Sequence, residues 1–254
     1  MTNDWGYIQT LATTLNQNQP TVVNLAEILV HLNIKCRFLS LGTDVKGNPI
    51  LGASSIDSSA RKIIINNIQG GDYEHLSTRG RFTLAHEIGH IQLQHGDIQC
   101  TEIAMNQWTS RGEVESQANY FASALLLPTA AMKLVLNSSD LSLGIVKIIS
   151  QRFLASIQAV AIRLIKMVSG SYVLIKHNGV SIDWVISSCE YDYSVPNCID
   201  QDSLACALTE SRPRRRGKVD PCIWIGQPTD DIVCIEDSEK YEGFILTILN
   251  IYNE

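Results

Sequence analysis

The stretch RFTLAHEIGHIQLQHGD, residues 81–97, decides how the first half of this chain folds. Its apolar residues recur at the three- and four-residue spacing of an amphipathic helix. Ser77 or Thr78 can cap the start of this helix, and Gly96 stands where a C-terminal cap is expected. The sequence therefore predicts a helix with one buried face, around which the other elements are arranged.

The predicted helix carries an HExxH motif made of His86, Glu87 and His90. Residues four apart lie about 40° apart around a helix, so both histidines can direct a ring nitrogen at one ion. Glu87 lies near the same edge, where it can reach a metal-bound water without binding the metal. Neutral imidazoles and a carboxylate favour zinc with three protein ligands and an open position. The alternative is an exposed helix face with two unrelated histidines.

A third ligand is expected from the next helix, EVESQANYFASALLLP, residues 113–128. Glu115 and Asn119 are four apart on one face, so Glu115 can bind the ion while Asn119 orients a ligand by a hydrogen bond. Glu113 lies about 200° from Glu115 around the axis and is therefore not expected to share the site. His95 follows His90 at an angle unsuited to one metal, and we interpret it as a surface residue at the helix end.

The two stretches together resemble the ImmA/IrrE-type zinc metallopeptidases, small relatives of thermolysin. Residues 81–90 match the family pattern nearly throughout. The second helix matches at Glu115, Ala118, Asn119, Phe121, Ala122 and Pro128. The chain departs from the pattern at Gln94, where the family often has His, and at Gln117, where it often has Glu. The resemblance covers roughly residues 20–168.

The resemblance implies a small α+β zincin domain with a three-stranded sheet, the HExxH helix and the helix that carries Glu115. It also implies a zinc-dependent endopeptidase in which Glu87 activates a zinc-bound water. By resemblance, the substrate is a helix-turn-helix repressor or a similar regulatory protein, cut in a stress response or in a mobile element. His86, His90 and Glu115 would hold the Zn²⁺ ion.

The residues around the motif predict the remaining elements of this domain. Before the motif we expect helices over 7–17 and 22–32, and strands over 36–41, 50–56 and 62–65. After residue 128 the pattern indicates further helices up to residue 168, with a break near 137–140. The prediction is a peptidase domain over 1–137 and a helix-pair segment over 138–168.

Residues 169–254 change in character and are expected to form a strand-rich C-terminal α/β domain. The predicted strands cover 172–176, 180–186, 222–225, 232–235 and 244–251. In some relatives a sensor-like GAF domain occupies this position, and the ending YEGFILTIL, residues 241–249, resembles one loosely.

The amino-acid composition limits which binding partners and which cell compartment we expect for this protein. The 20 Lys and Arg against 26 Asp and Glu give a net charge of −6, which argues against nucleic acid as a partner. Apolar runs fall short of the roughly 18 residues that cross a bilayer, and the start MTNDWGYIQT lacks a secretory signal, so no membrane partner is expected. The seven cysteines lack CxxC spacing, so we expect them to be mainly small, buried apolar residues. Reduced thiols of this kind are typical of a cytoplasmic protein.

A different class of function remains open at this stage. The chain can instead be a transcriptional or partner-binding regulator in which the metal is only structural. The helix pair around 141–167 and the basic run RPRRRGK, residues 212–218, would support that alternative. The presence of Glu87 argues against this alternative, because a structural zinc site does not need this carboxylate.

Overall fold

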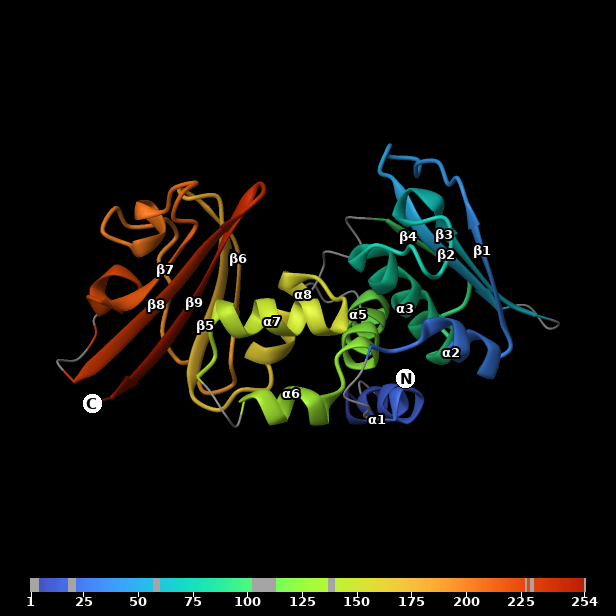
Figure 1. Ribbon diagram of the computed structural model, residues 1–254, viewed down its shortest axis with the longest axis horizontal. Coiled ribbons are helices and arrows are strands. Elements are labelled where there is room, and N and C mark those ends of the chain that lie inside the picture. The colour runs from blue at the N-terminus through green and yellow to red at the C-terminus, as the bar shows by residue number, and fades with distance from the viewer. Residues whose placement is uncertain are drawn as a thin grey trace. The chain divides into compact units, whose positions relative to one another are not determined.

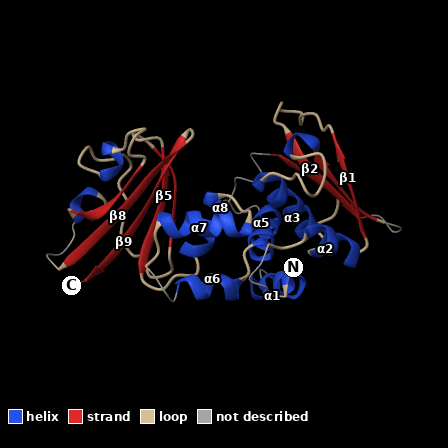
Figure 2. Cartoon of the chain, viewed as in Figure 1, coloured by secondary structure: helices blue, strands red, loops and turns tan. Residues whose placement is uncertain are grey.

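The computed structural model describes residues 5–253 apart from 18–21, 57–59, 102–112, 137–139, 227 and 229–230. The chain divides into two compact units (Figure 1). The first contains Met1–Met132 and Ser150–Ser156, and the second contains Lys133–Ile149 and Ile157–Glu254. Helices and strands occur together in the chain (Figure 2), which confirms the predicted mixed α+β class. The three predicted domains and their boundaries stay a prediction.

The helices run in chain order along the first two thirds of the protein. They are α1 (Trp5–Asn16), α2 (Leu25–His31), α3 (Thr78–Gln92), α5 (Glu113–Leu126), α6 (Thr129–Leu136), α7 (Leu143–Phe153) and α8 (Ile157–Ile165). The motif helix α3 begins where Ser77 accepts a hydrogen bond from the backbone N–H of Gly80, at 3.0 Å. It ends before the predicted cap, because Gln94 adopts the left-handed conformation with φ 57°. This early end turns the chain at His95 back toward the helix.

The first sheet has four described strands, so the predicted three-stranded sheet is wrong by one strand. The strands are β1 (Ile34–Leu39), β2 (Ile50–Ile56), β3 (Arg61–Asn66) and β4 (Ile98–Thr101), in the order β1-β3-β2-β4. β1 and β3 are parallel, whereas β2 pairs antiparallel with both β3 and β4. The strand β4 was missed because it has four residues, of which only Cys100 is buried.

The helix α3 packs against β2 and β3 of this sheet (Figure 1). Ile63 and Ile65 are two apart on β3 and point to one face, where both are fully or almost fully buried. Leu84 and Ile88 are four apart on α3 and are fully buried. The apolar residues of β3 and those of α3 are therefore buried in the same core. Burial of these residues holds α3 against one face of the sheet.

The second unit contains a five-stranded antiparallel sheet in the order β6-β5-β9-β8-β7. The strands are β5 (Ser171–His177), β6 (Ile182–Ser187), β7 (Arg214–Val219), β8 (Ile232–Tyr241) and β9 (Phe244–Asn253). One face packs around Trp224, which is fully buried together with Val173 and Leu249. The strand-rich character predicted for this part of the chain is confirmed, and a sensor-like role stays a prediction.

Two expectations about the second unit are wrong. Residues 222–225 do not form a strand: Pro221–Ile223 is a 3₁₀ turn, because Asp220 caps it by accepting from the N–H of Cys222. The basic run 212–218, for which no strand was predicted, contributes most of the strand β7. It pairs with the acidic strand β8, where Arg214 stands opposite Glu239 and Arg216 opposite Asp237. Opposite charges on facing strands make this pairing favourable.

Within the described ranges, we find no single helix with both the length and the hydropathy that a membrane crossing requires. Two bent pairs of helices meet those criteria only when they are taken jointly, as buried core helices also do.

Candidate metal centre

The metal centre is built where α3 and α5 cross. Gly89 on α3 lies against the ring of Phe121 on α5, and a methyl group at Gly89 would come within 3.0 Å of that ring. A glycine at this position therefore allows the two helices to approach closely. The approach brings Glu115, at the start of α5, next to the two histidines of α3.

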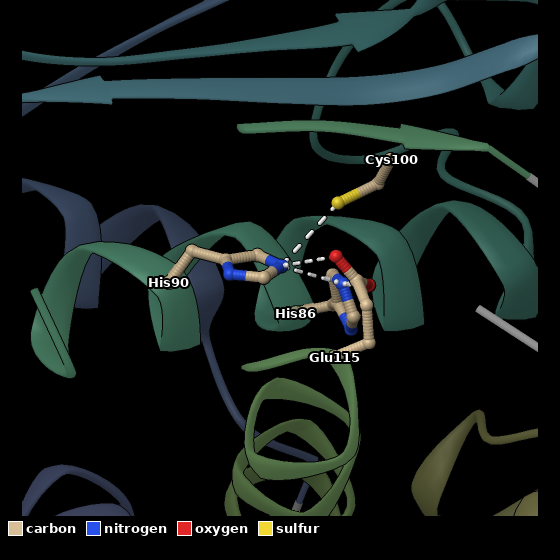
Figure 3. A group of neighbouring side chains, drawn as sticks. All are labelled: His86, His90, Cys100 and Glu115. Carbon is tan, nitrogen blue, oxygen red and sulfur yellow. Dashed lines mark hydrogen bonds and ion pairs between the residues drawn. The ribbon is translucent and has the colours of Figure 1, made fainter. Parts of the chain in front are cut away.

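Three predicted ligand side chains meet at one point (Figure 3). The Nε2 atoms of His86 and His90 are 2.9 Å apart. The carboxylate of Glu115 places Oε2 3.1 Å from Nε2 of His86 and Oε1 3.7 Å from Nε2 of His90. Both histidines are fully buried, and the Glu115 side chain is 20% exposed. The structure therefore brings together His86, His90 and Glu115, although their roles as ligands stay a prediction.

The electrostatics of Glu115 suit a ligand carboxylate. Burial raises its pKa, but the imidazoles of His86 and His90 outweigh this and lower the pKa to about 2. The carboxylate is therefore ionised across the physiological range. The side chain of Glu113, the acidic alternative, lies outside the described residues.

A hydrogen-bonded relay fixes the ring of His90, and sequence reasoning missed it. Nε2 of His95 is 3.0 Å from Oε1 of Gln117, which can only accept, so His95 donates there. Nδ1 of His95 must then accept from Nδ1–H of His90, at 2.9 Å. The other ring nitrogen of His90, Nε2, is left with its lone pair facing His86 and Glu115, as a metal ligand requires.

This relay corrects the interpretation of His95 as a surface residue. His95 is half-buried, and burial lowers its pKa, which favours the neutral form that the relay needs. Gln117, a departure from the family pattern, keeps the oxygen acceptor that a glutamate would offer at this position. Asn119, the predicted orienting residue, is buried one turn beyond Glu115. Its proposed hydrogen bond to a ligand stays a prediction.

Glu87 lies in an unusual environment. Its side chain is fully buried. The thiol of Cys100 and the hydroxyl of Ser54 lie close to the carboxylate, but neither makes a hydrogen bond of good geometry with it. Burial raises its pKa to about 7, although His90, Cys100 and Ser54 oppose that shift. A buried carboxyl with such poor hydrogen bonding is costly in a merely structural role. Such a group is typical of a functional site.

Cys100 is a second residue that sequence reasoning missed. Its Sγ, on the edge strand β4, is 3.4 Å from Nε2 of His90 (Figure 3). The general interpretation of the cysteines as buried apolar residues is also wrong, since Cys189, Cys198, Cys206 and Cys222 are exposed. Burial and the carboxylates of Glu87 and Glu115 raise the pKa of the Cys100 thiol. A lone cysteine after the motif helix gave no signal, because the strand that carries it was not predicted.

These donor atoms fit a metal ion. One ligand atom each from His86, His90, Cys100 and Glu115 lies within 4.8 Å of the others. Two imidazole nitrogens and a carboxylate oxygen are the donor set of zinc in peptidases. Among the described residues, Nδ1 of His86 has no hydrogen-bond partner. This does not weaken the fit to a metal, because the ring nitrogen that faces the other ligand atoms is Nε2. The residues present therefore suit a divalent ion of the zinc type.

Comparisons with known proteins bear on the family and on the fold of the chain. Residues 57–165 match the model of the IrrE N-terminal-like domain, peptidase family M78. The match begins later than the predicted resemblance and ends close to it. No curated protein matches the chain in a sequence comparison. A solved structure of a Mycobacterium tuberculosis transcriptional regulator is similar, with a TM-score of 0.59 and 12% identity over 96% of this chain and 76% of the other. This similarity shows the fold alone.

The motif helix, the ligand cluster and the match over residues 57–165 define a domain of the metallopeptidase class. Over residues 57–165 the match confirms the resemblance to the ImmA/IrrE-type family that the two helix motifs predicted.

Proposed function

We propose that this protein is a zinc-dependent endopeptidase in which His86, His90 and Glu115 hold the ion and Glu87 is the general base. The observation that carries the proposal is the position of Glu87, a fully buried carboxyl that lies on α3 beside the cluster of His86, His90 and Glu115. When bound there, a zinc ion lowers the pKa of water and polarises the carbonyl of the scissile peptide. A base with a pKa near the working pH is well suited to accept and return a proton.

The work of Glu87 is proton transfer. The carboxylate takes a proton from the attacking water and passes it to the nitrogen of the departing amine, where it completes the new amino terminus. Cys100 and Ser54 lie close to the carboxylate but make no hydrogen bond of good geometry with it, so they compete only weakly with a water for its oxygens. Gly52 provides the space for the carboxylate beneath β2.

The sheet supports a polypeptide substrate. β4 lies at the edge of the first sheet, and no further strand pairs with it in the part of the chain that the structure describes. An extended peptide can add to such an edge by main-chain hydrogen bonds. Cys100 on β4 lies beside His90, so a peptide added here would pass the metal centre. We propose a helix-turn-helix repressor or similar regulator as substrate, on the strength of the family.

We propose that the protein acts in the cytoplasm. All seven cysteines are free thiols, as expected in a reducing compartment. Nucleic acid is not proposed as a partner. The basic strand β7 is matched by acidic residues of β8, and Asp237 accepts two hydrogen bonds from Arg214 at 2.8 and 2.9 Å.

A pair of substitutions tests the proposed roles. Glu87→Gln should retain about one zinc per chain and lose cleavage by at least ~100-fold, the usual contribution of a general base. Glu115→Gln should lose the metal, whereas Glu74→Gln, at an exposed carboxylate, should keep both metal and activity. The measurements are metal content after dialysis and cleavage of a co-expressed repressor. Equal cleavage by Glu87→Gln and wild type would contradict the proposal.

The rival is a regulator with a structural metal, suggested by the four-donor cluster and by the fold similarity to a transcriptional regulator. A closed site of four protein ligands is typical of structural zinc. The rival predicts that Glu87→Gln leaves every function intact, and that removal of zinc unfolds the protein rather than only inactivating it.

A further inference from the structure

The thiol of Cys100 enters the ligand cluster from the side opposite α5. Figure 3 shows its sulfur pointing from β4 toward the point where His86, His90 and Glu115 meet. Sγ lies 3.4 Å from Nε2 of His90. The thiol is thus placed at the corner that three protein ligands would otherwise leave open.

Three of the separations among the four candidate ligand atoms are close to those around one ion. Around a tetrahedral zinc with bonds of about 2.0–2.3 Å, neighbouring ligand atoms lie roughly 3.3–3.6 Å apart. The corresponding separations here are 2.9 Å between the two Nε2 atoms, 3.1 Å from His86 to Glu115, and 3.4 Å from His90 to Cys100. The sulfur–nitrogen distance falls within that interval, and the other two require shifts of a few tenths of an ångström. All four ligand atoms lie within 4.8 Å of one another, so the widest pair would have to close on a bound ion.

The position of Cys100 is fixed by the sheet. β4 pairs with β2 so that Cys100 stands opposite Gly52, and the side chain is fully buried. Leu51 is buried beside it, and Phe82 and Ile98 pack on the same small cluster. This packing accounts for a buried cysteine. The sulfur also contacts Nε2 of His90. A thiol hydrogen bond and a shared metal ion both bring these two atoms together, and the spectrum described below distinguishes them.

We propose that the Cys100 thiolate is the fourth ligand of the metal in the resting protein, which closes the site. The peptidase is then latent, and catalysis requires the sulfur to leave. Opening would break the metal–sulfur bond: the released thiolate would take a proton from solvent to become a thiol, and a water molecule would occupy the position that the sulfur leaves. The ligand assignment stands by itself, whereas latency rests on the proposed peptidase function.

X-ray absorption of the zinc-loaded full chain tests the ligand assignment without an activity assay. Wild type should show one sulfur neighbour at about 2.3 Å, together with nitrogen and oxygen neighbours. Cys100→Ser should lose the sulfur contribution and keep the others. Cys36→Ser, at the other cysteine before residue 150, is the matched control and should keep it. The wild-type spectrum is sufficient to test the assignment, even if Cys100→Ser does not fold. A zinc ion surrounded only by nitrogen and oxygen neighbours in wild type would overturn the assignment.

Cleavage of unfolded, fluorescently labelled casein tests latency. If about one molecule in ten is open at rest, Cys100→Ser should cleave about tenfold faster than wild type. The gain should disappear in the double variant with Glu87→Gln, and Cys36→Ser should cleave at the wild-type rate. A sulfur ligand without any rate gain in an active Cys100→Ser would overturn latency. A sulfur ligand with no cleavage of casein or repressor by any variant would instead overturn the peptidase function and leave the ligand assignment standing.

Discussion

Gly52 on β2 and Glu87 on α3 are packed so closely that a methyl group on Gly52 would lie 2.8 Å from Oε1 of Glu87. The same methyl group would lie 2.9 Å from the methyl carbon of Thr83. A strand residue without a side chain is therefore what allows the proposed general base to sit beneath the sheet.

Gly52→Ala should consequently displace the Glu87 carboxylate. We expect cleavage to fall by about tenfold or more, since small misplacements of reacting groups carry large rate penalties, while zinc content stays unchanged. Gly42→Ala is the control, because nothing lies within 4 Å of the added methyl group there. An active Gly52→Ala would mean that Glu87 can act from another position.

The relay from Gln117 through His95 to His90 predicts an effect on zinc affinity without a change of ligand. Gln117→Leu removes the terminal acceptor and should weaken zinc binding by roughly 10-fold to 100-fold, the usual cost of losing a group that orients a metal ligand. Gln117→Glu keeps an oxygen acceptor and should retain the affinity. Competition with a chromophoric chelator measures both, and equal affinity of the Leu and Glu variants would contradict the relay.

His177 predicts how stability depends on pH. The ring is fully buried; its Nδ1 accepts from the N–H of Gly179, and its Nε2 therefore donates to Thr247 at 2.9 Å. Burial lowers the pKa of His177 to about 4, below the value of 6.5 for an exposed histidine. Between these two values the unfolded chain binds the extra proton, so the free energy of unfolding should fall as pH is lowered from about 6.5 toward 4.

Urea titrations at several pH values measure this dependence. The contribution of one histidine is at most about 1.4 kcal/mol per pH unit. His177→Gln keeps a donor and an acceptor but does not titrate, so its stability should decline less than that of wild type between pH 6.5 and 5. Parallel curves for the two proteins would show that His177 does not control acid stability.

Asp237 predicts a large loss of stability in the second unit. Its buried carboxylate accepts from Nε and Nη2 of Arg214 and from the N–H of Leu143 at the start of α7, at 2.8–2.9 Å. Asp237→Ala leaves Arg214 and this N–H without their acceptor and should cost about 3–5 kcal/mol, as for a broken buried pair. Asp183→Ala removes the pair with Lys176, in which Asp183 is 41% exposed, and should cost at most about 1 kcal/mol. Chemical denaturation compares them, and equal losses would contradict the buried role.

Local sequence determined the helices that carry the chemistry and the residue types of the proposed site. His86, Glu87 and His90 lie four residues or fewer apart on one helix, so helical geometry alone relates them. Glu115 followed from a second amphipathic helix with small residues on one face. These relations are short in sequence, and the period of a helix is enough to predict them.

Only the tertiary structure decided what surrounds that site. Cys100 reaches His90 because β4 pairs with β2, and a four-residue strand with one buried residue leaves no readable pattern. His95 turns back to His90 because Gln94 adopts a left-handed conformation, which neither residue's identity predicts. The basic strand β7 is a strand because β8 supplies opposite charges across the sheet. The two strand pairings join separate segments of the chain, and such pairing is set by the assembled core rather than by local preference. The turn at Gln94 is local, but a left-handed backbone at a residue other than glycine is not readable from its identity.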